Sequence, residues 1–187
     1  MNNQWKIPGA VLSIPRSNAA QVPEMFRTMF LTGGIVLGQV TNLTGLEPYA
    51  IQNWVKRGFL APPQRKRYNL DQVCRILLIN TFKSVLPMER ICGLLSFVNG
   101  RLDDSSDDII RDSDLYFLFV RLAGQAREIN DEFQAQALIN EYLADYEEPA
   151  PGARERVAQA LRVMLIAWLA TRMLHAVDCA MEEMKEV

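Results

Sequence analysis

The chain has 187 residues, of which 49% are hydrophobic and 22% charged. This composition is typical of a globular protein and excludes a largely disordered one. Its three cysteines are odd in number and far apart, which excludes a disulfide framework and is typical of a reducing compartment. The net charge of −2 hides a polarity: residues 35–101 carry nine basic and three acidic side chains, whereas residues 103–187 carry eight and eighteen. A basic module joined to an acidic one suggests that one part of the chain contacts phosphates.

Neither a signal peptide nor a membrane span is expected. The first 13 residues hold a single Lys and no continuous apolar run. The longest apolar stretch, Val163–Thr171, has nine residues and lies between Arg162 and Arg172, whereas a span needs about 20. We therefore expect a soluble, cytoplasmic protein.

Residues 1–34 are predicted to be an N-terminal arm with a short helix. Met1–Ala20 contains prolines and serines without sustained periodicity, and we expect it to be poorly ordered. Pro23–Phe30 has an apolar face long enough for one or two helical turns, and Gly33 and Gly34 then break the chain.

Two short helices are predicted next. Ile35–Thr44 has apolar residues at helical spacing, and Gly45 suits the left-handed position that ends a helix. Pro48 suits the first turn of the following helix, Pro48–Arg57, where a missing N–H has no intrahelical partner anyway. Two helices joined by a short turn that contains glycine make a helix-turn-helix. The side chains expected to point inward from the second helix are Ile51, Trp54 and Val55.

A short hairpin, or wing, is predicted after these helices. Residues 61–68 contain two prolines, which exclude a helix, and end in three basic residues and an aromatic one. Asn69 suits the N-cap of a helix over Leu70–Val85, which has a strong apolar stripe, and a further helix is expected over Pro87–Val98. Residues 35–101 are therefore predicted to form one DNA-binding domain.

Residues 102–187 are predicted to form an acidic loop and a helical dimerisation region. Helices are expected over Leu115–Leu122, Gln125–Asp145 and Ala153–Lys185. The last has a broad apolar stripe, which would be an aggregation patch if it stayed exposed, so we expect the Gln125–Asp145 helix and a second subunit to cover it. Alternatively, its methionines and Trp168 line a ligand pocket.

Three segments resemble the MerR family. Thr44–Leu60 has a Thr-Gly pair, a helix-starting Pro, a helix with a central Ile and then a Gly followed by apolar residues. Arg67–Val73 resembles the end of that family's wing, and Pro87–Leu95 resembles its fourth helix. The chain also resembles an uncharacterised bacterial family of MerR-like proteins. The resemblance implies a mainly α protein, in which a MerR-type winged helix-turn-helix precedes an acidic helical bundle, and it makes Pro48–Arg57 the recognition helix.

Eight residues are predicted to contact double-stranded DNA. Gln and Asn side chains can read adenine in the major groove, and clustered cations contact phosphates. The residues are Tyr49, Gln52, Asn53 and Lys56 on the recognition helix and Arg65, Lys66, Arg67 and Tyr68 in the wing. The alternative for both sets is an ordinary solvated polar surface.

No catalytic set, metal site or cofactor is predicted. The chain has one His, no Gly-rich phosphate loop and no Gly-x-Ser-x-Gly motif. The Asp-rich loop could hold a hard cation, but it lacks the glycine and glutamate of an EF-hand, so a solvated helix cap is favoured. His175 and Cys179, one turn apart, supply only two metal ligands. The aspartates concerned are Asp103, Asp104, Asp107 and Asp108.

These features predict a homodimeric, sequence-specific DNA-binding regulator of transcription that is not an enzyme. The alternative is a protein-interaction adaptor that keeps the winged helix as a scaffold and uses the acidic tail as its working surface. The sequence leaves the operator, any small-molecule effector and the regulated genes open.

Overall fold

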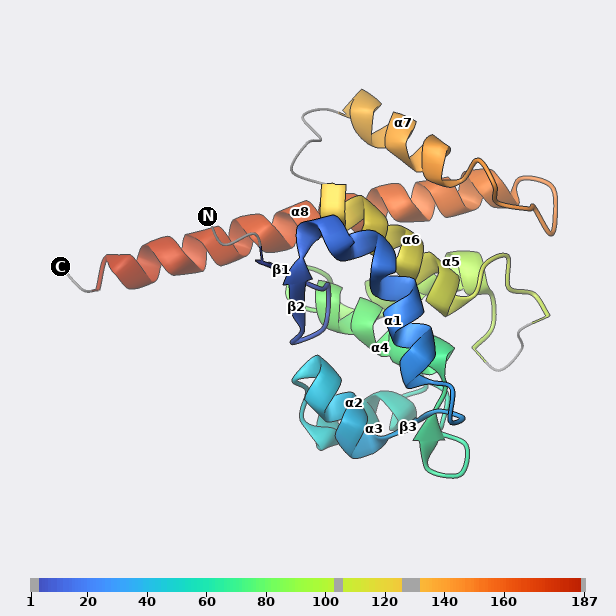
Figure 1. Cartoon of the computed structure of the whole chain (residues 1–187), viewed down its shortest axis with the longest axis horizontal. Helices are drawn as coiled ribbons and strands as arrows, with labels where there is room; N and C mark the ends of the chain where they lie inside the picture. The colour runs from blue at the N-terminus through green and yellow to red at the C-terminus, as the bar shows by residue number, and fades with distance from the viewer. Residues whose placement is uncertain (1–3, 103–105, 126–131, 186–187) are drawn as a thin grey trace.

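The computed structural model describes residues 4–102, 106–125 and 132–185, and the protein is mainly helical, as predicted (Figure 1). Its two small sheets have two strands each. The elements in chain order are β1 (Gln4–Lys6), β2 (Ser13–Pro15), the 3-10 helix η1 (Arg16–Gln21), α1 (Val22–Met29), β3 (Ile35–Val36), α2 (Leu37–Thr44), α3 (Pro48–Lys56), β4 (Arg67–Tyr68), α4 (Leu70–Phe82), α5 (Met88–Asn99), α6 (Asp112–Gln125), α7 (Glu132–Tyr142) and α8 (Ala153–Glu183).

Helix α4 is the central element of the fold. Every residue from Val73 to Ile79 is buried, so the helix is covered on all sides, which is typical of a core helix. Helices α2, α5, α6 and α8 pack around it. Its predicted N-cap is confirmed: the Oδ1 atom of Asn69 accepts from the backbone N–H of Gln72 at 2.8 Å, and the Gln72 side chain accepts from the backbone N–H of Asn69 at 2.9 Å.

A buried ion pair fixes α6 on α4. The Arg75 guanidinium lies 3.2 Å from the Asp112 carboxylate and also donates to the carbonyl of Phe59, which precedes the hairpin. Burial raises the pKa of Asp112, and the nearby Arg75 opposes this rise. One turn earlier on α4, the Asp71 carboxylate accepts from the backbone N–H of Ser113 at 3.0 Å. Two charged side chains of α4 thus hold the first turn of α6.

The prediction of a poorly ordered arm over Met1–Ala20 is wrong for the described residues of that segment. Strands β1 and β2 pair antiparallel, and the loop between them inserts into the protein, with Ile7 fully buried and Ala10 1% exposed. The buried Tyr116 hydroxyl donates to the carbonyl of Pro8 at 2.9 Å. The segment is ordered by partners far away in the sequence, which local periodicity cannot reveal.

Asn80 joins this loop to the end of α2. Its Nδ2 atom donates to the carbonyl of Gly9 at 2.7 Å and to the carbonyl of Thr44 at 3.0 Å. Gly9 has a φ of 73°, and a Cβ at this position would overlap the carbonyl oxygen of Leu77 on α4. Only glycine lets the loop approach α4 so closely.

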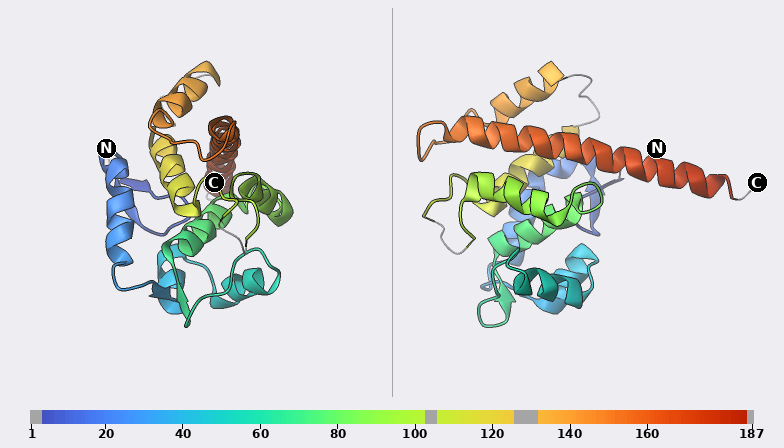
Figure 2. Two further views of the ribbon diagram at one scale, coloured as in Figure 1. Left: turned by 90° about the vertical axis from the view of Figure 1, so that its right-hand side faces the viewer. Right: turned by 180° about the vertical axis from the view of Figure 1, so that it is seen from behind.

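Helix α8 crosses the back of the protein and extends beyond it (Figure 2). Its first half is part of the core through Val157, Leu161 and Met164, whereas the residues from Met173 onward are exposed. By length and composition the helix could cross a membrane: its most apolar 18-residue stretch has a mean hydropathy of 1.4, and 28% of that stretch is buried. This property was not predicted from the sequence, because Arg162 and Arg172 interrupt the apolar run.

One hydrophobic core runs through the three predicted parts of the chain. It includes Ile7 from the N-terminal loop, Leu77 from α4 and Leu161 from α8. The division into residues 1–34, 35–101 and 102–187 stays a prediction, and the packing shows that each of these parts contributes to the same core. The predicted helix over Gln125–Asp145 lies partly outside the described residues, and α7 occupies its later part.

Candidate nucleic-acid interface

Helices α2 and α3 are joined by a three-residue turn. Gly45 ends α2 with a φ of 71°, and its N–H donates to the carbonyl of Thr41 at 2.8 Å. Pro48 occupies the first turn of α3. Ile51 and Trp54, which are 0% and 6% exposed, anchor α3 to the core. The predicted turn and helix start are therefore confirmed, as is the inward direction of Ile51 and Trp54, whereas Val55 is half-buried and α3 ends at Lys56.

A tight hairpin follows α3. The N–H of Arg67 donates to the carbonyl of Gln64 at 2.8 Å, and the two residues between them have positive φ values, 49° for Arg65 and 63° for Lys66. Such two-residue turns ordinarily contain glycine, asparagine or aspartate, because other residues are strained in the left-handed region. The two cations at the tip are thus held in an unfavourable backbone conformation.

Long-range hydrogen bonds position this hairpin beside α3. Strand β4 pairs antiparallel with β3, with Ile35 opposite Tyr68. The Gln72 side chain donates to the carbonyls of Ala61 and Pro62, both at 3.0 Å. The Arg67 guanidinium donates to the carbonyl of Gly34 at 2.7 Å. The hairpin is therefore fixed to α4 and to the segment before α2.

Seven of the eight predicted contact residues are exposed, and Tyr68 is not. Tyr68 is 3% exposed, and burial raises the pKa of its hydroxyl. It supports the hairpin from below, because the register with Ile35 turns its ring into the protein. Arg67 is exposed, but its guanidinium is engaged by Gly34. The exposed residues are Tyr49, Gln52, Asn53 and Lys56 on α3 and Arg65, Lys66 and Arg67 in the hairpin.

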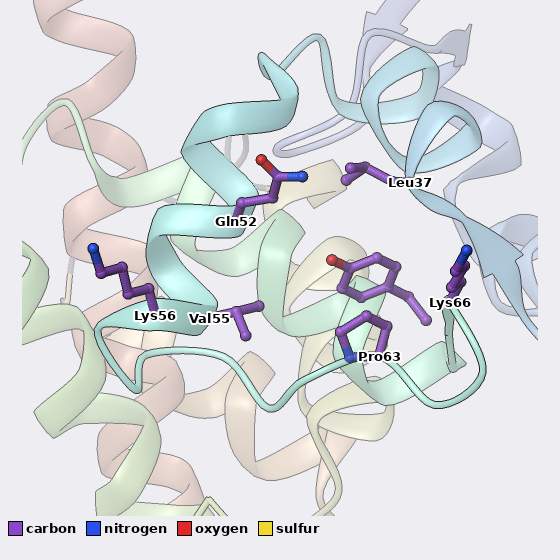
Figure 3. A pocket seen from close by; sticks show the side chains of 7 residues that line it. Leu37, Gln52, Val55, Lys56, Pro63 and Lys66 are labelled. Atoms are coloured by element: carbon purple, nitrogen blue, oxygen red, sulfur yellow. The ribbon is translucent and has the colours of Figure 1, made fainter.

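A groove of about 510 Å³ separates α3 from the hairpin (Figure 3). Gln52 and Lys56 stand on α3 at one side of it, and Lys66 stands on the hairpin at the other. With the buried Tyr68, which also lines it, the structure thus brings four of the predicted residues together around one concavity. The rest of the lining was not predicted from the sequence, because apolar residues carry no binding signal by themselves. These residues are Leu37 at the start of α2, Val55 and Pro63.

The cations around the groove differ in how far they are neutralised. Within the described part of the chain, Lys56, Arg65 and Lys66 form no ion pair. Arg57 by contrast lies 3.2 Å from the Glu89 carboxylate and 4.5 Å above the Phe59 ring. Positive charge is therefore available at the hairpin tip and at the end of α3.

The described residues contain no group of three or more side chains suited to hold a metal ion. The Sγ atom of Cys179 lies 3.8 Å from the His175 ring, and both residues are exposed. The Asp107 carboxylate accepts from the backbone N–H of Arg101. Burial, followed by the neighbouring carboxylates, raises the pKa of Asp108 to about 6. The predicted loop residues Asp103 and Asp104 lie outside the described residues.

Residues 28–119 match the model of a domain of unknown function, DUF1836. This range runs from the end of α1 into α6 and includes the groove. The chain is also similar to the uncharacterized protein YkrK of Bacillus subtilis (strain 168), with 35% identity over 80 residues. The similar part covers 41% of this chain and about a third, 34%, of YkrK. No solved structure matches the chain.

The resemblance to the MerR family, and to MerR-like relatives, is wrong. The family model that matches describes a different family, and the similar protein YkrK carries no MerR assignment. The structure gives a physical reason for the misleading motif. Gly45 has a left-handed conformation and Pro48 begins a helix, so the Thr-Gly pair and the proline satisfy local backbone requirements that any similar turn would impose.

Proposed function

We propose that α2, α3 and the hairpin act as a winged helix-turn-helix that binds double-stranded DNA, and that the protein is a sequence-specific regulator of transcription in the cytoplasm. The observation that carries this proposal is the groove, where exposed Gln52 and Lys56 of α3 face Lys66 of the hairpin. A helix fits the major groove, where a glutamine can make two hydrogen bonds to adenine. The hairpin cations then contact phosphates on the flanking backbone.

The strained hairpin tip also supports the proposal that the protein binds DNA. A turn that needs positive φ at two successive positions would be more stable with glycine or asparagine there. Arg65 and Lys66 occupy these positions instead and form no ion pair among the described residues. Strained residues concentrate at functional sites, where function outweighs the cost in stability. Phosphate binding would explain two cations at this place.

Double-stranded DNA would be bound by a homodimer. Along α8, the residues Val163, Ile166, Ala170, Met173, Val177, Ala180 and Met184 are all exposed and are spaced alternately three and four apart. We call these seven residues the α8 seam. This spacing is the heptad pattern with which two helices pack side by side. The α8 seam is about 30 Å long, contains no charged residue and lies on the opposite face of α8 from its buried residues.

The occupant of the α8 seam that fits best is a second copy of α8. In the projecting half of the helix, Arg172, Asp178 and Glu182 lie on the face away from the seam. The projecting half is therefore amphipathic, as in a helix that pairs with a partner in water, whereas a lipid-spanning helix would be apolar on all sides. Pairing two copies also lets two α3 helices read two half-sites.

A protein-interaction adaptor is the second candidate function. The apolar lining of the groove supports it, because Leu37, Val55 and Pro63 could receive an apolar side chain of a peptide. In that case the cations around the groove would bind an acidic peptide, and the acidic C-terminal region would be a separate surface.

Selection of genomic fragments by the purified full chain, read by sequencing, distinguishes the two functions. DNA binding predicts an enriched motif with two half-sites about one helical turn apart. A Gln52→Ala chain should enrich a relaxed motif, whereas an Arg90→Gln chain, altered outside the groove, should enrich the original motif. Retention of random fragments alone would refute sequence-specific binding, and retention of no DNA would favour the adaptor.

A further inference from the structure

A second cleft, of about 470 Å³, lies between the N-terminal loop, α4 and α8. Its apolar wall includes Ile7, Pro8 and Trp168. Its polar wall includes Lys6 from β1 and Arg172 and His175 from α8. The cleft is lined on the side of α8 opposite the α8 seam, so pairing of two copies would leave it open.

The charge of this cleft is one-sided. None of the described Asp or Glu residues lines it. Lys6 and Arg172 form no ion pair with any described residue, although acidic side chains are abundant in the C-terminal half of the chain. Two cations without acidic neighbours at one cleft make a favourable place for an anion. A guanidinium in particular can bind a carboxylate through two parallel hydrogen bonds.

The apolar wall contains an unused hydrogen-bond donor. The Trp168 ring packs edge-on against Phe119, with 6.2 Å between the ring centroids. Its Nε1 atom is buried and has no hydrogen-bond partner among the described residues. Buried tryptophan N–H groups ordinarily find a partner. The same side chain lines the cleft, so a bound molecule would change the surroundings of this N–H group.

We propose that the cleft binds a small organic carboxylate with an apolar body. Arg172 and Lys6 hold the carboxylate, and Trp168 and the N-terminal loop beside Pro8 contact the body. The volume of the cleft is within the range of small-molecule sites, which combine an apolar wall with a few polar groups. The proposal concerns binding alone and does not depend on whether the protein binds DNA.

The cleft also borders the hydrogen bonds that hold the end of α2. Gly9, Thr44 and Asn80 line it, and the Asn80 amide joins the carbonyls of the other two. Thr44 is the last residue of α2. A molecule in the cleft therefore touches the hydrogen bonds that hold the helix pair beside the groove, and any effect on the groove would pass through these bonds.

The proposal is tested on the full chain without DNA, with benzoate, 1-naphthoate and octanoate as probes and the uncharged 1-naphthalenemethanol as a matched comparison. Calorimetric titration should show that at least one carboxylate binds, and that 1-naphthoate binds about ten-fold more tightly than the alcohol. In the nuclear magnetic resonance spectrum, the indole N–H signal of Trp168, assigned with a Trp168→Phe chain, should move on binding.

Variants of the two cations locate the site. Arg172→Gln should weaken carboxylate binding about ten-fold and leave binding of the alcohol unchanged, and Lys6→Gln should act in the same direction. Lys185→Gln, beyond the end of α8 and outside the cleft, should change neither. Arg172 is half-exposed and unpaired within the described residues, so its replacement should leave the melting temperature unchanged. Absence of binding by all three carboxylates up to about 10 mM, equal binding of acid and alcohol, or an unaltered affinity in Arg172→Gln would overturn the proposal.

Discussion

Arg75 and Asp112 form an ion pair that is almost wholly shielded from water, with their side chains 5% and 12% exposed. The pair connects α4 to the first turn of α6, and Arg75 also holds the carbonyl of Phe59 just before the hairpin. A buried charge that loses its partner is costly, whereas removing both charges often costs little.

Replacing Arg75 alone should therefore destabilise the protein strongly. Arg75→Met leaves the Asp112 carboxylate buried without a counter-charge, and we expect a loss of about 3–5 kcal/mol in the free energy of unfolding. Arg75→Met with Asp112→Leu should lose clearly less. Denaturant unfolding followed by circular dichroism measures both. A double variant as unstable as the single one would show that the loss comes from the bond to Phe59 and from packing.

Asp108 should make stability depend on pH. Its pKa in the folded protein is raised to about 6, mainly by burial, so the folded state binds the proton more tightly than the unfolded state. The protonated Asp108 therefore contributes most to stability below about pH 4, and this contribution declines as the pH rises through about 6.

Asp108→Asn should remove this decline and raise stability at pH 7 by about 1 kcal/mol, a value reduced for solvent screening at a partly accessible site. Melting temperatures between pH 4 and 7, compared with an Asp178→Asn chain altered on the projecting part of α8, provide the measurement. Parallel curves for Asp108→Asn and the unchanged protein would contradict the raised pKa.

The hairpin tip should trade stability for affinity. Arg65→Asn with Lys66→Gly places residues that tolerate positive φ in the turn, and we expect a gain of about 1 kcal/mol in the free energy of unfolding. Loss of two phosphate contacts should reduce the slope of log affinity against log salt by roughly 1.8 per subunit. Arg67 is kept because it holds Gly34.

Thermal unfolding and salt-dependent binding to random DNA give the two readings for this variant. A more stable protein with an unchanged salt slope would show that the hairpin cations do not contact DNA. The strain in the turn would then have no functional explanation.

Gln52 should carry discrimination between bases. Gln52→Ala should cost roughly 1–3 kcal/mol on the preferred site and almost nothing on random DNA, because a bidentate contact reads a base edge. Lys56→Gln should weaken binding to both in similar proportion, as expected for a phosphate contact. Competition binding with cognate and random duplexes separates these patterns, and equal losses for Gln52→Ala on both would contradict base reading.

The α8 seam should control the oligomeric state. Val177→Glu places a charge in the middle of the projecting part of the seam, and we expect a dimer to become a monomer in light scattering. Glu182→Lys, on the opposite face, should remain dimeric. Removal of the whole of α8 would be a poor test, because Val157, Leu161 and Met164 belong to the core. A monomeric unchanged protein would refute the pairing.

Local features of the fold could be predicted from sequence, whereas features made by distant partners could not. Gly45, Pro48 and Asn69 act on the backbone beside them, so their roles could be recognised. The inward direction of Tyr68 depends on pairing with Ile35, more than 30 residues earlier. The order of the N-terminal loop depends on Tyr116, whose hydroxyl reaches Pro8 across 108 positions. The groove combines both kinds of feature, so only its polar residues were identified.

The amide of Asn80 has a consequence for the route by which the chain folds. It joins partners that are 71 and 36 positions away in the sequence, and the Tyr116 bond to the same loop closes a still longer stretch of chain. Contacts between distant positions slow folding, because the entropy of closing the intervening chain is lost before they form. The ribosome makes the N-terminal loop before α4 and α6, yet the loop can reach its place only after both helices have left the exit tunnel. Until then the end of α2 lacks its anchor, so the helix pair should be among the last parts of the molecule to become protected from hydrogen exchange.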